Sequence, residues 1–539
     1  MDVIFKNSKV YDGSKSTPYI ADVQIKDGKI AAISDHLSGA NEKDCRGLCL
    51  APGFIDVHTH SDSQIYVEPS RYCKAKQGVT FEIGGQCGWS RAPLSSSASK
   101  EAVDYLGTIY PVKNYPMYAT FAKQMEAAER IPLGIHQASF VGHHLIRGSV
   151  VGMENRPATA DEIRQMIPLV EEAMTSGAMG LSTGLVYAPG CYSTLDELIE
   201  LMKVVSRYNG IHTTHMRDEG DFLEKSVADT IRIAKETGVR TNISHIKAMY
   251  SQNWHKTEHV LKMIDDANAS GCDIAFDAYP YEACSATILS TLPPSYLSHD
   301  MDWLVDHLTG EKAIRELADA IYHPTEQWEN PVRNIGLDKI LIVIAMNSPD
   351  AVGKTVAEYA QLRGIEPIAA YAEIIAKSRG KASDVRFAMS NESIQRFYQH
   401  PLCMVGTDGL YTHGKGLTHP RAFGTFPRFL GRLVRDHGIM SFAEGIHRIT
   451  GQAADWYGLK NKGYIRAGYD ADLVLFDEDR LIDHADYLDP YIPNEGIHRV
   501  YVMGDVLVER NAMTEVRNGT LYRKFNINSH FLFREEASI

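Results

Sequence analysis

The sequence predicts an α/β protein: a (β/α)8 barrel of the TIM type with a small β-sandwich and a lid insertion. Three observations support this fold class. Short β-type runs alternate with helical patterns in the middle of the chain, both ends are β-rich, and a long segment interrupts the alternation before the last run. The predicted parts are a sandwich portion at 1–52, a barrel at 53–464 with its insertion at about 293–400, and a second sandwich portion with a tail at 465–539.

The two ends of the chain have the pattern of half-buried strands. Hydrophobic and polar residues alternate, and Asp-Gly pairs at 12–13 and 27–28 and a Gly-Asp pair at 504–505 are typical of hairpin turns. We therefore expect both ends to join one β-sandwich. Its expected strands are 3–5, 9–11, 21–25 and 30–33 at the beginning, and 471–476, 500–503 and 506–508 at the end.

The middle of the chain contains eight β-type runs, with helical spacing of apolar residues between many of them. Strands that alternate with helices indicate a parallel sheet, and eight such units close a barrel. Hydroxyl residues followed by acids, at 159–162 and 193–197, are typical of helix starts. The runs lie near Ile55, Val79, Leu133, Met179, Ile211, Thr241, Ile274 and Met404, and the clearest helices are 161–176, 194–208, 222–237 and 257–269.

The segment from about 293 to 400 is far too long for one crossover between neighbouring strands. It lies before the last barrel strand, so its elements are expected at the barrel mouth, where an insertion acts as a lid. Its expected helices are 302–307, 313–321, 352–362 and 368–377, and an apolar run covers 340–344.

Six residues of metal-binding types lie where predicted barrel strands end. The two histidines of the His-x-His motif are two apart on a strand, so they point to the same side. Barrel enzymes hold their chemistry at the carboxyl ends of the strands. Imidazole, thiolate and carboxylate together favour Zn²⁺ over Mg²⁺ or Ca²⁺, which prefer oxygen ligands. The expected metal residues are His58, His60, Cys87, His215, His245 and Asp408.

Composition narrows the class of protein. The chain has 539 residues and a net charge of -13, which argues against nucleic acid or an anionic membrane as a partner. The first residues lack the pattern of a signal peptide, and no apolar run approaches ~18 residues. The eight cysteines show no disulfide framework. We expect a cytoplasmic enzyme that acts on a small molecule.

Short motifs spread over nearly the whole chain point to one family. They are PGFIDVHTH at 52–60, GQCG at 85–88, GLSTG at 180–184, HMR at 215–217, SHIK at 244–247, DAYPY at 277–281, GTDG at 406–409, HPRAFGTFP at 419–427 and GYDADLV at 468–474. With them the chain resembles the amidohydrolase superfamily and, within it, the N-acyl-D-amino-acid deacylases, or D-aminoacylases. Other branches use a carboxylated lysine to bridge two metals, whereas D-aminoacylases have a cysteine on the second strand, where Cys87 stands.

The resemblance implies a zinc enzyme that hydrolyses an N-acyl bond. Cys87, His215 and His245 match the positions that hold the tightly bound zinc, and His58, His60 and Asp408 those around a second, weaker metal position. The chain departs from the family at Gln86, where Asn is more common, and at Gly142-His-His, where the family has a single histidine. Neither departure removes a metal ligand.

The remaining site residues have roles that depend on chemistry or on the resemblance. Asp408 is the candidate general base, with a plain metal ligand or a helix N-cap as the alternatives. Lys247 lies two residues after His245 and points to the same site, and with Tyr279 and Arg421 it matches the family's carboxylate-binding positions. Further candidates for the pocket wall are Ser285, Tyr187 and Tyr192, and Arg217 is a candidate for support of His215.

Three functions stay open at this point. The first is deacylation of N-acyl-D-amino acids, with neutral or hydrophobic side chains favoured over D-glutamate or D-aspartate because the segment 282–292 contains no Lys or Arg. The second is hydrolysis of a cyclic amide, as in dihydroorotases and hydantoinases, most of which need the bridging lysine. The third is an inactive barrel that serves as a binding scaffold, a class that typically loses metal ligands.

Overall fold

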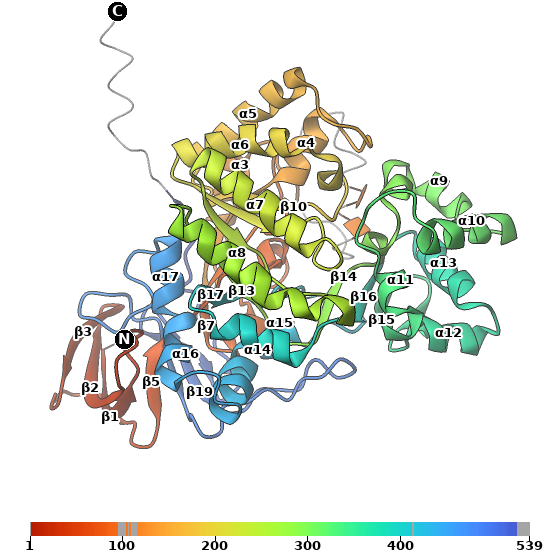
Figure 1. The fold of residues 1–539 in the computed structure, drawn as a ribbon. Coiled ribbons are helices and arrows are strands. Elements are labelled where there is room, and N and C mark those ends of the chain that lie inside the picture. The colour runs from red at the N-terminus through yellow and green to blue at the C-terminus, as the bar shows by residue number, and fades with distance from the viewer. Residues whose placement is uncertain are drawn as a thin grey trace, which may run out of the picture.

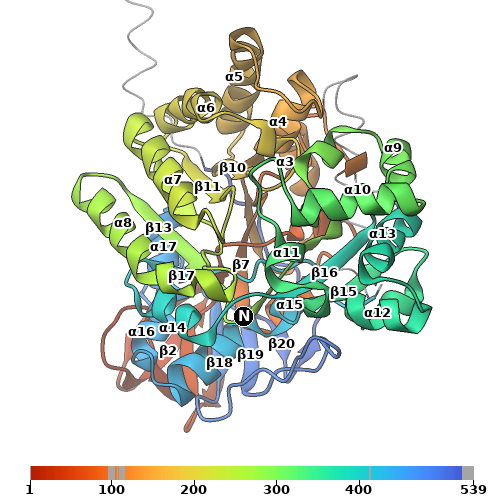
Figure 2. The same ribbon diagram turned by 45° about the vertical axis from the view of Figure 1, so that its right-hand side comes forward.

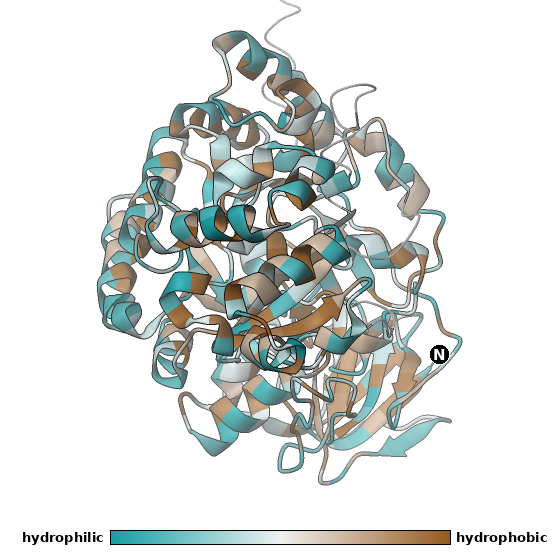
Figure 3. Cartoon of the chain, turned by 90° about the vertical axis from the view of Figure 1, so that its right-hand side faces the viewer, coloured by the Kyte–Doolittle hydropathy of each residue, from teal (hydrophilic) through white to brown (hydrophobic). Residues whose placement is uncertain are grey.

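The computed structural model describes residues 2–94, 104–105, 107–108, 116–411, 414 and 416–524. Figure 1 shows three parts: helices around a central set of strands, a sheet beside the N-terminus, and a separate group of helices, α9 to α13, on one flank. Hydrophobic residues gather on the strands and on the inner faces of the helices, as expected when an amphipathic helix covers a sheet (Figure 3).

Eight parallel strand positions follow one another in chain order, as predicted. Two short strands, β8 and β9, are separated by Phe140 and share the third position. A parallel bridge from Thr59 to Gly409 joins the ends of the first and last positions and closes the barrel. The strands are β6 (Phe54–Asp56), β7 (Val79–Gly84), β8 (His136–Ser139) with β9 (Val141–Gly142), β10 (Gly180–Gly184), β11 (Ile211–His215), β12 (Arg240–Ile243), β13 (Ile274–Ala278) and β17 (Cys403–Val405).

The four helices predicted most clearly are present within one or two residues. The Thr159 side chain accepts a hydrogen bond from the Glu162 N–H, and the Thr159 N–H donates one to the Glu162 carboxylate, which completes a capping box. At the start of the next helix, the Thr194 side chain accepts a hydrogen bond from the Glu197 N–H. The barrel helices are α1 (Tyr72–Ala75), α3 (Phe121–Ala128), α4 (His143–Val150), α5 (Ala160–Thr175), α6 (Leu195–Arg207), α7 (Leu223–Thr237), α8 (Thr257–Ala269), α14 (Asn391–Gln399), α15 (Arg421–Arg428), α16 (Phe442–Arg448) and α17 (Gly451–Tyr457).

Both ends of the chain join one continuous hydrogen-bonded sheet, as expected, and residues from its two halves share one hydrophobic core. The reason is β5 (Cys49–Pro52), which pairs in parallel with β1 and antiparallel with β18 and so links the two ends. The other strands are β1 (Val3–Val10), β2 (Tyr19–Lys26), β3 (Lys29–Ser34), β4 (Glu42–Asp44), β18 (Leu473–Phe476), β19 (Ile497–Val502), β20 (Asp505–Glu509) and β21 (Ala512–Met513).

The hairpin turn predicted at Asp12-Gly13 is wrong. Strands β1 and β2 are joined by a longer loop, residues 11–18. Gly13 has φ +86, and a Cβ atom there would lie 2.1 Å from the Gly463 carbonyl oxygen. The glycine therefore allows a close contact between the two ends of the chain and not a two-residue turn. The turn at 27–28 joins β2 and β3 as predicted, and the one predicted at 504–505 lies one residue earlier, at Met503-Gly504, since Asp505 already pairs with Val502.

The insertion before β17 folds around its own small sheet, which was not predicted. Strand β16 (Ala382–Phe387) lies between β14 (Ala283–Thr287) and β15 (Ile340–Ala345), and both pairings are antiparallel. The helices α9, α10, α12 and α13 correspond to the four expected ones, and they surround this sheet beside the barrel (Figure 2). Their bounds are α9 (Met301–Asp306), α10 (Glu311–Tyr322), α11 (Pro331–Ile335), α12 (Val356–Arg363) and α13 (Pro367–Ser378).

The last described residues run along the barrel. Gly519 and Leu521 form isolated bridges with Leu133 and Gln137, beside the third strand position. The rest of the expected tail, 525–539, lies outside the described residues. Across the part of the chain that the structure describes, no helix has the length and apolar character needed to span a membrane.

Candidate active site

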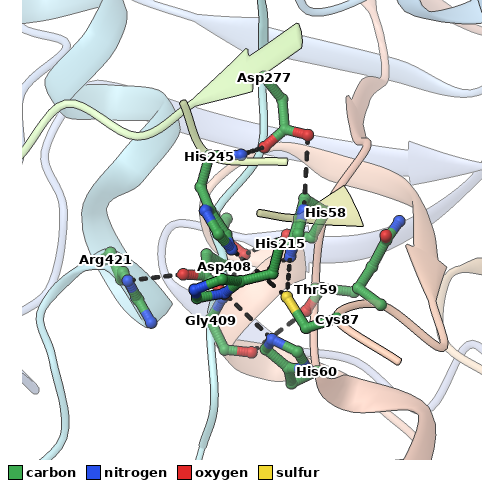
Figure 4. A network of polar contacts seen from close by, with 12 residues as sticks. His58, Thr59, His60, Cys87, His215, His245, Asp277, Asp408, Gly409 and Arg421 are labelled. Carbon is green, nitrogen blue, oxygen red and sulfur yellow. Dashed lines mark hydrogen bonds and ion pairs between the residues drawn. The ribbon is translucent and has the colours of Figure 1, made fainter. Parts of the chain in front are cut away.

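The six expected metal residues converge at the carboxyl ends of the barrel strands, although 350 positions separate the first from the last (Figure 4). His58 and His60 follow β6, His215 ends β11, and the others stand two or three residues after their strands. Two overlapping groups result. His58, His60, Cys87 and Asp408 form one, Cys87, His215 and His245 form the other, and within each group the ligand atoms lie within 4.8 Å of one another.

Cys87 links the two groups. Its Sγ atom lies 3.3 Å from His58 Nε2 and 3.4 Å from His245 Nε2. On the other side, Asp408 Oδ1 lies 3.0 Å from His60 Nε2 and 3.5 Å from His58 Nε2. This spacing suits one ion, or two ions that share the thiolate.

The backbone at three of these residues has an uncommon conformation. Cys87 has φ 52, His245 has φ 36 and Asp408 has φ 47, all in the left-handed region that side chains other than glycine rarely adopt. Such a conformation costs on the order of 1–3 kcal/mol per residue and persists where the surrounding structure requires it. Each residue stands just beyond a strand, so the turn directs its side chain into the barrel mouth.

The protonation of these groups fits a zinc site. Burial lowers the pKa of His215 and of His245 well below the usual range, so both rings are neutral and offer a lone pair. Burial, with a contribution from Asp408, raises the pKa of the Cys87 thiol well above its usual value. A buried thiolate therefore needs a cation beside it, and a thiolate with imidazoles and a carboxylate is a donor set that zinc accepts.

Two buried carboxylates, Asp277 and Glu219, contact the histidines of the site from behind, and neither was predicted to have a role. Asp277 accepts a hydrogen bond from the His245 N–H at 2.8 Å, and its other oxygen lies 3.4 Å from His58 Nδ1. Glu219 lies 3.2 Å from His245 Nδ1 and 3.4 Å from His215 Nε2. Groups of this kind orient metal ligands and raise their basicity. The only sequence signal for Glu219 is its place four residues after His215.

The expected carboxylate-binding residues form a second cluster beside the metal residues. Arg421 Nη1 lies 2.8 Å from Asp408 Oδ2, and the guanidinium stacks 4.6 Å from the centre of the Tyr279 ring. The Lys247 ammonium lies 5.7 Å from the same ring and 2.7 Å from Glu219 Oε2. The buried Tyr279 hydroxyl has no hydrogen-bond partner among the residues described. Burial opposes ionisation of Asp408, but Arg421 and nearby histidines hold the pKa of its carboxyl well below the usual range.

Two cavities meet at this cluster and share Tyr187, Ser285, Ala286 and Asp408. The larger, of about 650 Å³ including its opening, is here named the apolar cavity. The smaller, of about 340 Å³, is named the polar compartment. The apolar cavity is lined chiefly by Trp89, Val343, Ile344, Leu410 and Leu417, and the polar compartment by Glu219, Lys247, Tyr279, Ser290, Glu329 and Arg386.

Tyr192 and Arg217, two of the predicted site residues, lie outside both cavities. Tyr192 is not among the described residues that line either cavity, and its hydroxyl donates to the Pro294 carbonyl at 2.9 Å, which ties the β10–α6 loop to the insertion. Arg217 donates to the Cys191 and Ser193 carbonyls, so it supports that same loop.

The polar compartment contains a cation that the segment 282–292 does not supply. Arg386 on β16 pairs across the sheet with Cys284 on β14, about a hundred positions earlier, and so faces the site. Its Nε lies 2.9 Å from Asp384 Oδ1, and Nη2 lies 3.2 Å from Oδ2. The absence of a cation from the β14 segment therefore does not make the polar compartment free of cations, but both Lys247 and Arg386 already have a carboxylate partner.

The two departures from the family pattern have structural explanations. Gln86 donates to the Val57 carbonyl at 3.0 Å and so joins the first and second strand positions. His144 stacks 4.0 Å from Trp89, and its Nε2 lies 3.2 Å from the Cys87 carbonyl oxygen. His143 turns away to Glu197, at 3.0 Å. One histidine thus steadies the Cys87 backbone while the other holds a helix.

Comparison with known proteins finds relatives over nearly the full length. A family model described as the amidohydrolase family matches residues 42–508. A D-aminoacylase of Alcaligenes xylosoxydans xylosoxydans is 33% identical, over 95% of this chain and 96% of that protein. An N-acyl-D-glutamate deacylase of the same organism is 32% identical, over 94% and 93%.

A solved structure has the same fold. The crystal structure of an N-acyl-D-glutamate deacylase from Bordetella bronchiseptica, complexed with zinc and a phosphonate inhibitor that mimics the tetrahedral intermediate, matches with a TM-score of 0.83. The two sequences are 30% identical, over 97% of this chain and 99% of the other. The chain therefore belongs to the amidohydrolase family, as an enzyme of the D-aminoacylase type.

Proposed function

We propose that this enzyme is a zinc-dependent hydrolase that removes the acyl group from N-acyl-D-amino acids whose side chains carry no net charge. The observation that carries the proposal is the convergence of Cys87, His215 and His245 at the barrel mouth, beside the cations Lys247 and Arg421. The similarity to D-aminoacylases supports both the reaction and the choice of D-amino acids.

The metal roles follow from the donor groups. Cys87, His215 and His245 are proposed to hold the tightly bound zinc, and His58, His60 and Asp408 to surround a second, weaker position. When bound, zinc polarises the scissile carbonyl and lowers the pKa of a water ligand toward ~7.

Asp408 is proposed to act as the general base and then as the general acid. Its carboxylate is held ionised in the free enzyme by the ion pair with Arg421. An ionised carboxylate can take the proton of the attacking water and deliver it to the leaving amine nitrogen. The substrate's own carboxylate competes for Arg421, so substrate binding loosens the pair that restrains Asp408.

The carboxylate of the substrate is proposed to bind Lys247, Tyr279 and Arg421. The Tyr279 hydroxyl is buried and unpartnered among the described residues, and the ring that carries it lies close to both cations, a set of donors suited to an anion with several acceptor lone pairs. Because Lys247 and Tyr279 line the polar compartment, the amino-acid half of the substrate is expected there. The acyl group then lies in the apolar cavity, with Tyr187 and Ser285 at the boundary between the two.

The preference for an uncharged side chain follows from the pairing of the cations. Lys247 is paired with Glu219, and Arg386 with Asp384. An acidic side chain would meet carboxylates beside each cation, and like charges brought together in a buried site disfavour binding. Specificity for D-glutamate or D-aspartate is the second candidate, because relatives with those activities are nearly as similar as D-aminoacylase.

The test is metal analysis of the purified protein, followed by deacylation assays. We expect at least one zinc per chain, turnover of N-acetyl-D-methionine, and turnover of N-acetyl-L-methionine and N-acetyl-D-glutamate that is lower by at least about tenfold, or ~1.4 kcal/mol. Dihydroorotate and hydantoin are the control substrates. Hydrolysis of either control substrate without deacylation would assign the enzyme to the cyclic-amide hydrolases. Protein that binds no zinc and turns over none of these substrates would favour an inactive barrel that serves as a binding scaffold.

A further inference from the structure

The polar compartment contains an acceptor and a donor that the protein leaves without partners. Glu329 stands on the insertion between α10 and α11 and is 5% exposed. Its Oε2 accepts the Glu219 N–H at 2.9 Å. Among the described residues, no hydrogen bond or cation meets its Oε1, unlike the carboxylates of Glu219 and Asp384, which each face a cation.

Arg386 supplies the matching donor. Its Nε and Nη2 atoms are bonded to Asp384, and Nη2 also donates to the Ser290 hydroxyl at 2.7 Å. Within the described part of the chain, Nη1 has no acceptor. Arg386 and Glu329 line the same compartment, and their charges influence each other, yet they form no ion pair. An N–H group of Arg386 and a carboxylate oxygen of Glu329 are therefore left for a ligand of this compartment.

We propose that the polar compartment recognises a side-chain carboxamide, so that N-acyl-D-glutamine or N-acyl-D-asparagine is the preferred substrate class. The carboxamide oxygen accepts from Arg386 Nη1, and its NH₂ group donates to Glu329 Oε1. This inference rests on the proposed function, since Lys247 and Tyr279 in the same compartment are assigned to the carboxylate of the same substrate. It narrows the neutral substrates to those with one donor and one acceptor.

Other side chains match the two groups less well. A carboxylate places two acceptors against the carboxylate of Glu329, and an ammonium places three donors against the guanidinium of Arg386. An alkyl side chain covers both groups without giving either a hydrogen-bond partner, so it is expected to be selected at least about tenfold less well than a carboxamide. A hydrogen-bonding site rejects analogues that lack the bonding group much more strongly than an apolar pocket rejects a change of size.

The first test uses the wild-type zinc enzyme and four N-acetyl-D-amino acids: glutamine, its near-isostere methionine, glutamate and lysine. All assays are run at pH 9, because burial raises the pKa of Glu329 to about 8 and only the ionised carboxylate accepts the NH₂ group of a carboxamide. We expect kcat/KM for the glutamine derivative to exceed each of the others by at least about tenfold. An equal or greater value for methionine, glutamate or lysine overturns the inference while the deacylase function stands. No turnover of any of the four refutes the proposed function itself, so the two failures are distinguishable.

The second test exchanges the acceptor for a donor. In Glu329→Gln the amide oxygen must face the Glu219 N–H, so the NH₂ group points into the compartment. We expect the ratio of kcat/KM for glutamine over glutamate to fall by at least about tenfold. The new NH₂ group repels the NH₂ group of a carboxamide but donates a hydrogen bond to a carboxylate. The matched control is Glu326→Gln on the same loop, whose carboxylate bonds Ser295 outside the compartment, and it should leave the ratio unchanged. An unchanged ratio in Glu329→Gln overturns the inference.

Discussion

Two buried polar clusters, at opposite ends of the barrel, use the same residue types in different ways. At the amino end of β8, His136 bonds Thr520 and Asp472, and Lys462 bonds Asp470 and Asp472 at 2.8 and 2.6 Å. At the mouth, the ligand atoms of Cys87 and the histidines lie within 4.8 Å of one another in two groups, and His215 Nδ1 and the Tyr279 hydroxyl lack partners among the residues described. The polar groups of the first cluster have hydrogen-bond partners within the protein, whereas the second cluster leaves polar groups for a ligand.

The difference separates structural polar groups from functional ones. Buried polar groups are normally hydrogen-bonded, so an unsatisfied group calls for a specific explanation. The cluster around His136 joins the barrel to the terminal sheet, because Asp472 lies beside β18 and also accepts the Met503 N–H at 2.9 Å. We therefore expect changes at the mouth to remove zinc and turnover, and changes at the other end to lower stability.

The largest effect is expected at the shared ligand. Replacing Cys87 with Ser removes the soft donor common to both metal groups, so zinc binding should fail and kcat/KM should fall by roughly 10⁴-fold, on the order of 5 kcal/mol. Zinc content and steady-state kinetics measure both effects. A variant that keeps one zinc per chain and normal turnover would show that Cys87 is not a metal ligand, and would contradict the functional role assigned to the cluster at the mouth.

The next effect concerns the general base. Asp408→Asn keeps an oxygen at the metal site but cannot accept a proton, so kcat should fall by about 10²–10⁴-fold while tightly bound zinc remains. Kinetics and metal analysis of the same preparation are needed together. Near-normal kcat would reduce Asp408 to a metal ligand or a cap.

The third prediction concerns the opposite cluster. Asp472→Asn leaves the buried His136 without a carboxylate and leaves Lys462 with Asp470 alone, and loss of one partner of a buried pair costs about 3–5 kcal/mol. We expect a lower midpoint of urea unfolding, with zinc content and kcat/KM of the folded enzyme unchanged. Loss of zinc in this variant, at a denaturant concentration where it is folded, would show that the two clusters are not independent.

The smallest effect is a pH dependence that sharpens the role of Glu329. Burial, together with Asp218 and Glu219, raises the pKa of Glu329 from 4.5 to about 8. Its folded-state pKa lies above the unfolded value, so its contribution to stability is complete below pH 4.5 and is lost as the pH rises toward 8. Glu329→Gln removes this dependence. We expect the Tm of the variant minus that of the wild type to increase between pH 5 and pH 9, and a constant difference would contradict the shift.

Much of the site was predictable because of a topological rule. In a barrel of parallel strands all carboxyl ends meet at one mouth, so ligand types at strand ends identify a shared site without any distance. For the same reason the apolar spacing predicted α5 to α8 closely, since an amphipathic helix must turn one face to the sheet. Cys87, His245 and Asp408 were predicted in this way, but their left-handed backbone conformation was not. A glycine would have indicated that conformation, and none of the three positions is a glycine.

Local periodicity and chain order were enough to predict the barrel, the joining of both chain ends in one sheet, and the six residues that meet at the barrel mouth. Which charges pair and which stay unpaired depends on tertiary packing. Arg386 reaches the site through its pairing register with Cys284, and Glu329 through a loop packed against Glu219. Such contacts join segments more than a hundred positions apart, so no local pattern in the sequence indicates them, and side-chain specificity is expected to arise where those segments meet.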